Sequence, residues 1–180
     1  MHEFQDTLYQ FFRDITFFEP FMSSRWGWPI VESLHFIGLS LLVGAVGMFD
    51  LRLLGMAKSV PFTTLHRLIP WGVAGYLTNV CTGFLFLTSA PDQYIYNSAF
   101  QTKMVFMLLA GLNVATFYSA TFRRLKTLGP NDAVPFRARL AGGASLALWT
   151  GIIIFGRLIT FYRPFNCLEG EPIGFLATCF

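Results

Sequence analysis

The chain has 180 residues, of which 54% are hydrophobic and only 13% are charged, and its mean hydropathy is +0.53. Soluble domains carry about 25% charged residues, so this composition excludes a soluble globular protein and predicts an integral membrane protein in contact with the lipid bilayer. The net charge of +3 is small, and no run of basic residues interleaved with aromatic ones indicates binding to nucleic acid.

Residues 1–27 are predicted to form an amphipathic helix that lies in the membrane interface. Its apolar residues recur with helical spacing among acidic and polar ones: Phe4, Leu8, Phe11, Phe12 and Ile15. Pro20 is expected to end this helix, and Trp26 and Trp28 mark the boundary between water and lipid where the next helix begins. A helix that packs on a partner subunit would show the same pattern, so both interpretations stay open.

Four uncharged runs follow the N-terminal segment, and they are 17, 24, 19 and 17 residues long. They lie between Glu32 and Asp50, Arg67 and Asp92, Lys103 and Arg123, and Arg139 and Arg157. A membrane-spanning helix needs about 17–25 mainly apolar residues, so each run predicts one span. We therefore expect an all-α fold. It is a four-helix transmembrane bundle over residues 28–162, preceded by the interfacial helix of residues 1–27 and followed by a periplasmic tail over residues 163–180.

The basic residues predict the orientation of the bundle. Eight of the thirteen Lys and Arg lie in or beside the loops after the first and third spans: Arg52, Lys58, Arg67, Arg123, Arg124, Lys126, Arg137 and Arg139. The loop of residues 90–99 has none. By the positive-inside rule the two basic loops are cytoplasmic, so both termini are periplasmic in a bacterial inner membrane. Cys167 and Cys179 then lie in an oxidising compartment, where they either pair or remain two thiols.

Polar residues inside a bilayer are expensive and are candidate functional residues by default. With a rise of about 1.5 Å per residue, His35 lies about 10 Å below the outer membrane edge, and Lys103 and Arg157 lie about 6 Å below it. One imidazole below two cations suits haem b, because the imidazole binds the iron and the cations bind the propionates. Glu32, one helical turn before His35, would orient the imidazole or accept a hydrogen bond from a cation. Met107 lies near the depth of His35 and is a candidate sixth ligand.

Other chemistry remains open for these residues. His35 could simply hydrogen-bond across helices. Glu32 and the two cations could form a structural ion cluster with no ligand, since cations near a membrane edge reach water at little cost. His35 with Met104 and Met107 could bind copper, although copper sites bring together more Met, His or Cys ligands than these three. A di-iron site is discounted, because it needs two Glu-x-x-His motifs and this chain has one.

His66 precedes the second span on the predicted cytoplasmic side. Between His35 and the loop that leads to His66, the first helix crosses the membrane over about 30 Å. The two histidines are therefore not expected to bind one iron. His66 is therefore a candidate ligand of a second haem or metal, with Tyr118 or Asp50 nearby, or else a solvated histidine at the interface.

Two groups of residues predict how the helices pack. Asp50, Arg52 and Arg67 are expected to form an ion network at the cytoplasmic ends of the first two spans. Small residues let helix backbones approach closely in lipid. The spans contain several of them: Ser40, Gly44, Gly72, Gly75, Gly111, residues 141–145 and Gly151. These small faces, together with the aromatic-rich helices, favour a homo-oligomer.

Several short motifs together carry a family resemblance. They are Val31-Glu-Ser-Leu-His35, Asp50-Leu-Arg-Leu-Leu-Gly55, Ile69-Pro-Trp71 with Gly75, Thr82-Gly83, Phe100-Gln-Thr-Lys103, Ala110-Gly-Leu-Asn113 and Gly156-Arg157. From about residue 28 to about residue 162 the chain resembles a family of uncharacterised bacterial integral membrane proteins with four helices. Its four-helix plan, with a histidine in the first helix, is loosely similar in architecture to the copper-resistance membrane proteins and to the haem-associated membrane protoporphyrinogen oxidases.

We therefore expect a membrane-bound b-type cytochrome that carries haem near the periplasmic side and acts in electron transfer or membrane redox chemistry. Quinone or a redox partner protein would exchange electrons with it. The alternatives are a non-catalytic structural or assembly subunit and a protein that handles copper or another metal. The sequence has no Gly-rich phosphate loop and no metalloprotease or serine-hydrolase motif.

Overall fold

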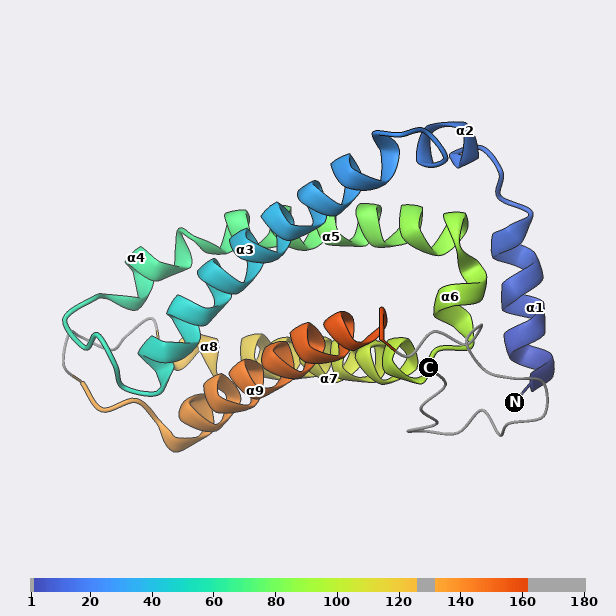
Figure 1. Cartoon of the computed structure of the whole chain (residues 1–180). Helices are drawn as coiled ribbons and strands as arrows, with labels where there is room; N and C mark the ends of the chain where they lie inside the picture. The colour runs from blue at the N-terminus through green and yellow to red at the C-terminus, as the bar shows by residue number, and fades with distance from the viewer. Residues whose placement is uncertain (1, 126–131, 162–180) are drawn as a thin grey trace. The chain divides into compact units, whose positions relative to one another are not determined.

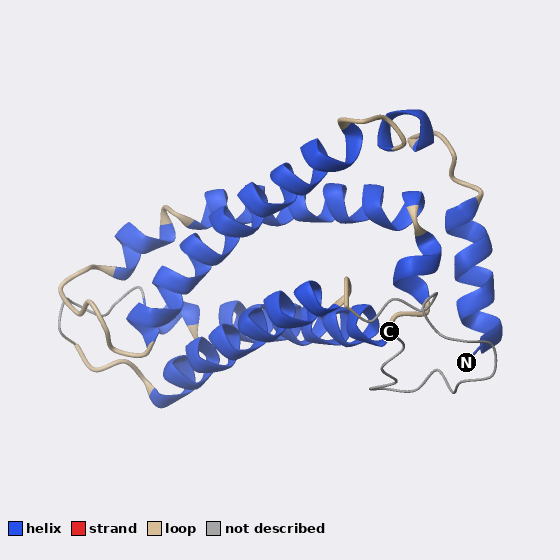
Figure 2. Ribbon diagram, in the orientation of Figure 1, coloured by secondary structure: helices blue, strands red, loops and turns tan. Residues whose placement is uncertain are grey.

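The computed structural model describes residues 2–125 and 132–161, and in these residues it contains helices and no strand (Figures 1 and 2). The all-α prediction is therefore confirmed. In chain order the helices are α1 (His2–Arg13), α2 (Glu19–Met22), α3 (Gly27–Leu53), α4 (Phe62–His66), α5 (Ile69–Ser89), α6 (Pro91–Ile95), α7 (Ser98–Ala120), α8 (Phe122–Leu125) and α9 (Phe136–Leu158). The tail of residues 163–180, with Cys167 and Cys179, lies outside the described residues.

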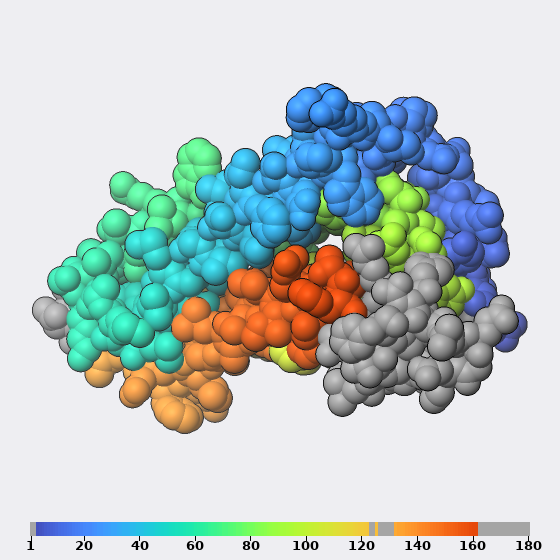
Figure 3. Space-filling model, in the orientation of Figure 1, coloured from blue at the N-terminus to red at the C-terminus, as the bar shows by residue number. Residues whose placement is uncertain are grey.

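Three of these helices, α3, α7 and α9, are long and apolar enough to cross a membrane. Large apolar side chains lie exposed along them, such as Ile37, Leu108 and Leu140. Figure 3 shows one face of the molecule, on which α3 (blue to cyan) lies at the surface. Exposed apolar surface of this kind is compatible with contact to a bilayer, and it supports an integral membrane protein. The fourth expected span, α5, has 21 residues and is not among these three.

The chain divides into two compact units. The first unit takes its residues from Met1–Phe36, Thr78–Val105 and Ile152–Phe180, and the second takes them from Ile37–Leu77 and Phe106–Gly151. Each of the four long helices contributes residues to both units. Each unit is therefore built from segments that are far apart in the sequence.

In the first unit, α1 packs against α6. The Tyr96 hydroxyl donates a hydrogen bond to Asp6 Oδ1 over 2.7 Å, and the Tyr9 and Tyr96 rings lie 5.8 Å apart. The hydrogen bond to the Asp6 carboxylate raises the pKa of Tyr96 to about 12. The predicted end of the first helix at Pro20 is wrong: α1 ends at Arg13, and Pro20 lies in the first turn of α2, where its missing N–H costs nothing. The position of α1 in a membrane interface stays a prediction.

Asn97 joins two parts of the first unit. Its side chain is 1% exposed, and its Oδ1 accepts hydrogen bonds from the N–H groups of Ala99 at 2.9 Å and Phe100 at 3.3 Å. These contacts cap the N-terminus of α7, whose first N–H groups have no partner inside the helix. The Asn97 Nδ2 donates to the Ile159 carbonyl over 3.0 Å and so fixes the chain just after α9.

We expect Asn97→Ala to lower the free energy of unfolding by about 2–3 kcal/mol, the sum of a lost cap and a buried carbonyl left unsatisfied. Asn97→Asp keeps the cap but loses the donor, so it should cost about half as much. Thermal unfolding in detergent, followed by circular dichroism, measures both losses. Gln93→Ala on α6 is the matched control, and equal midpoints for Gln93→Ala and Asn97→Ala would contradict the assignment.

The core of the second unit is a cluster of buried apolar side chains: Phe49, Leu53, Phe62, Leu65, Phe117, Leu125 and Ala138. Arg52, only 1% exposed, lies beside it with its guanidinium 4.3 Å from the centre of the Phe62 ring. Arg52 donates hydrogen bonds to the carbonyls of Val60 at 2.9 Å and Lys58 at 3.2 Å.

The predicted ion network of Asp50, Arg52 and Arg67 does not form among the described residues. The guanidinium of Arg52 instead binds the backbone of the loop that follows α3. The reason is geometric, because Asp50 and Arg52 are two residues apart on one helix, and residues at that spacing do not face each other.

Glycines permit close helix contacts in the second unit. A Cβ on Gly75 would collide with the Gly38 carbonyl oxygen and lie 2.8 Å from the Leu42 nitrogen. A Cβ on Gly142 would lie 2.9 Å from Leu53 Cβ. By contrast, no described atom lies within 4 Å of a Cβ on Gly44. The close approach predicted for small residues is thus confirmed at Gly75 and Gly142 and is not found at Gly44.

Candidate functional site

His35 is fixed by a hydrogen bond between α3 and α5. Its Nδ1 lies 2.7 Å from Thr82 Oγ1. The Thr82 hydroxyl donates its own proton to the Thr78 carbonyl, also over 2.7 Å. A threonine hydroxyl has one proton to donate, so when that proton goes to the Thr78 carbonyl the hydroxyl accepts from His35 and Nδ1 carries the hydrogen. In that tautomer the other ring nitrogen, Nε2, holds a lone pair and can bind a metal or accept a proton.

Aromatic side chains surround this histidine. The Phe86 ring lies 5.7 Å from the His35 ring in an edge-on arrangement, and Trp28 lies 5.0 Å from Phe86. Thr82 is 4% exposed, whereas His35 itself is only half-buried. The Nδ1 side of the ring is thus sheltered, and the remaining exposure of His35 leaves room for a partner.

Lys103 on α7 belongs to the same unit and lies within electrostatic range of His35. Its side chain runs over Gly156, where a Cβ would lie 3.5 Å from Lys103 Nζ and 3.7 Å from its Cδ and Cε. Gly156 thus provides the space that the lysine occupies. Among the described residues, no hydrogen bond or ion pair neutralises the Lys103 ammonium group.

Arg157 and Glu32 also belong to the first unit, and both side chains are exposed. The Arg157 guanidinium lies 5.5 Å from the centre of the Phe161 ring, in a cation–π contact. Within the described part of the chain, no hydrogen bond or ion pair links Glu32 to His35, Lys103 or Arg157. Four of the predicted residues therefore lie in one unit, and no hydrogen bond or ion pair among the described residues joins them to each other.

Met107 and His66 belong to the second unit. Met107 lines the cavity described below, and its role as a sixth ligand stays a prediction. The His66 ring stacks on Phe122 with centres 4.7 Å apart, and its Nε2 lies 3.4 Å from the Tyr118 hydroxyl. Tyr118 is thus the neighbour expected for His66. No group of three or more His, Cys, Asp or Glu that could hold a metal ion occurs among the described residues.

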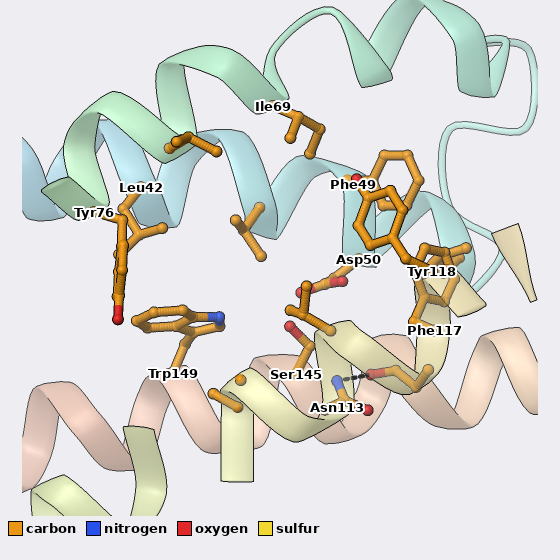
Figure 4. Close-up of a pocket in the computed structure, with 18 of the residues that line it drawn as sticks. Leu42, Phe49, Asp50, Ile69, Tyr76, Asn113, Phe117, Tyr118, Ser145 and Trp149 are labelled. Carbon is orange, nitrogen blue, oxygen red and sulfur yellow. Dashed lines mark hydrogen bonds between the residues drawn. The ribbon is translucent and has the colours of Figure 1, made fainter. Parts of the chain in front are cut away.

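The second unit contains a cavity of about 320 Å³ to which α3, α5, α7 and α9 all contribute (Figure 4). Asp50, 5% exposed, lines it, and its Oδ2 is buried without a hydrogen-bond partner among the described residues. Trp149 also lines the cavity, and its indole Nε1 is buried without a hydrogen-bond partner among the described residues. Ser145 is the hydrogen-bonding neighbour of the Asp50 carboxylate, and the Asn113 amide donates to the Ala141 carbonyl over 3.0 Å.

Sequence reasoning missed this Asp50 cavity. It placed Asp50 in an ion network at the cytoplasmic ends of the first two spans or near His66, and it assigned no role to Trp149. A usable signal was present, because Asp50 ends the first uncharged run and Trp149 lies within the last one. Which side chains face a common cavity depends on the rotation of each helix, which hydropathy does not give.

The model of one protein family matches residues 26–162. The chain belongs to the family of unknown function DUF6644. The DUF6644 match covers both the His35 group and the Asp50 cavity, and it leaves α1 and α2 outside. Its bounds agree with the resemblance over residues 28–162, whereas the likeness to copper and haem proteins stays a prediction. No curated protein and no solved structure matches the chain.

Proposed function

We propose that this chain is a membrane-bound b-type cytochrome in which His35 Nε2 binds the haem iron. The observation that carries the proposal is the 2.7 Å hydrogen bond between His35 Nδ1 and Thr82 Oγ1. Metal-binding histidines almost always donate their other ring N–H to a fixed acceptor, which sets the tautomer and the orientation of the ring. Thr82 is such an acceptor, because its own proton is held by the Thr78 carbonyl. Haem would supply one-electron redox chemistry.

Lys103 and Arg157 are proposed to bind the two propionates. An ammonium group within a membrane protein is costly unless an anion accompanies it. Lys103 has no anionic partner among the described residues, so a carboxylate from a cofactor would meet this need. Arg157 would add a planar guanidinium, which binds carboxylates through two parallel hydrogen bonds. Glu32 is proposed to assist from the exposed rim of the site.

We propose further that the fold is a four-helix transmembrane bundle with α5 as the fourth span. The loops after α3 and after α7 are both rich in Lys and Arg. Since α7 is long and apolar enough to cross a membrane, these loops lie on one side of it only if α5 crosses as well. At about 1.5 Å per residue, the 21 residues of α5 reach across a hydrocarbon core of about 30 Å. Both termini would then be periplasmic in a bacterial inner membrane, with α1 lying in the interface.

The proposed role is electron transfer with quinone or a redox partner protein, carried out by a homo-oligomer. Gly44 on α3 supports the oligomer, since no described atom lies within 4 Å of a Cβ at this position. Small residues that are open in one chain are the ones that neighbouring helices use for close contact in lipid.

The test is the absorption spectrum of the protein purified in mild detergent from haem-replete cells. We expect a Soret band in the oxidised protein and sharp α and β bands after reduction with dithionite, with haem in amounts comparable to protein. A folded but colourless protein would overturn the proposal and favour a structural or assembly subunit. Bound copper without a Soret band would favour the metal-handling alternative.

A further inference from the structure

The Asp50 cavity contains two buried polar atoms that the described part of the chain leaves unmatched. They are the carboxylate oxygen Oδ2 of Asp50 and the indole nitrogen Nε1 of Trp149. Figure 4 shows both side chains facing the same space, with apolar and aromatic residues around them. Buried polar groups in native proteins nearly always have a hydrogen-bond partner, so two exceptions in one cavity point to a ligand that bonds to both.

The chemistry of the two atoms restricts this ligand. A carboxylate accepts hydrogen bonds, whereas an indole N–H only donates. A hydroxyl group satisfies both, because it donates to Asp50 and accepts from Trp149. An ammonium group would satisfy Asp50 alone, and a lipid acyl chain would satisfy neither.

The walls of the cavity favour a flat ring. Phe49, Tyr76, Phe117 and Trp149 line it, and aromatic side chains pack well against ring faces and edges. Its volume of about 320 Å³ lies in the range of small-molecule sites, which are mainly apolar with a few polar groups that fix orientation.

We propose that the Asp50 cavity binds the ring of a lipid-soluble quinol, with a ring hydroxyl placed between Asp50 and Trp149. The inference deepens the proposed function, on which its redox role rests, because a quinol is an electron carrier that reaches a membrane cytochrome through the lipid. The binding itself rests on the cavity. Ser145 holds the Asp50 carboxylate in place, and Asn113 is already engaged by the Ala141 carbonyl.

The test is calorimetric titration of the full-length protein in detergent with decylubiquinol, a short-tailed quinol, kept reduced under anaerobic conditions. Trp149→Phe keeps a ring but removes the N–H, and Asp50→Leu keeps a similar shape but removes both acceptor oxygens. We expect each to weaken binding about tenfold, the effect of losing one good hydrogen bond. Trp71→Phe makes the same change at a tryptophan of the second unit that is 63% exposed, and it should bind like the wild type.

Wild-type affinity in both Trp149→Phe and Asp50→Leu would overturn the inference. So would binding of tetraphenylphosphonium that depends on Asp50 while decylubiquinol fails to bind, because the site would then be one for organic cations. The absorption spectra of the same preparations separate the two proposals. A colourless protein that binds decylubiquinol through these residues supports the cavity and overturns the haem, whereas a coloured protein with no such binding does the reverse.

Discussion

Replacing His35 with alanine is expected to abolish the haem absorption of the purified protein. The variant removes the imidazole whose Nε2 is proposed to bind the iron and leaves Thr82 without its partner. The measurement is Soret absorbance per protein, compared with wild type prepared in parallel. His66→Ala is the matched control, because the His66 ring stacks on Phe122 in the second unit, and it should retain the full band.

Variants of Thr82 extend this result to the orientation of the ring. Thr82→Val keeps the shape but removes the acceptor for the Nδ1 proton, and we expect haem affinity to fall about 10- to 100-fold. Thr82→Ser keeps the hydroxyl and should restore binding. Colour that survives in His35→Ala and disappears in His66→Ala would contradict the assignment and move the iron to His66.

Gly75→Ala is expected to destabilise the fold, although alanine is the better helix former. Its Cβ would collide with the Gly38 carbonyl oxygen and lie 3.0 Å from Leu41 Cβ, so backbone must move. Overpacking of this kind costs about 1–3 kcal/mol and sometimes more. The measurement is the midpoint of thermal unfolding in detergent, followed by circular dichroism and by the yield of monodisperse protein.

Gly44→Ala makes the same substitution in α3, where the described structure has no atom within 4 Å of the new methyl group. Here the helix propensity of alanine should dominate, so stability should stay equal or rise by up to about 1 kcal/mol. The two variants are thus expected to shift stability in opposite directions. Equal midpoints would show that α3 and α5 do not approach closely at Gly75.

Much of the architecture was predictable because hydropathy and helix periodicity are local properties of the chain. The apolar runs predicted helices, and α3, α7 and α9 have the length and hydropathy of membrane spans. His35 and Lys103 were singled out because an imidazole or an ammonium group is rare and costly in such a run. Their placement in one unit follows from similar depths on different helices.

What the sequence alone determined about this protein is therefore its helical, membrane-embedded character and the short set of polar residues that need an explanation. Only the tertiary structure decided their partners. It pairs His35 with Thr82, turns Arg52 toward loop carbonyls, and places Asp50 beside an aromatic cavity with Trp149. The physical reason is that a partner is chosen by the rotation and close approach of helices, which depend on contacts such as those at Gly75, between residues distant in the chain.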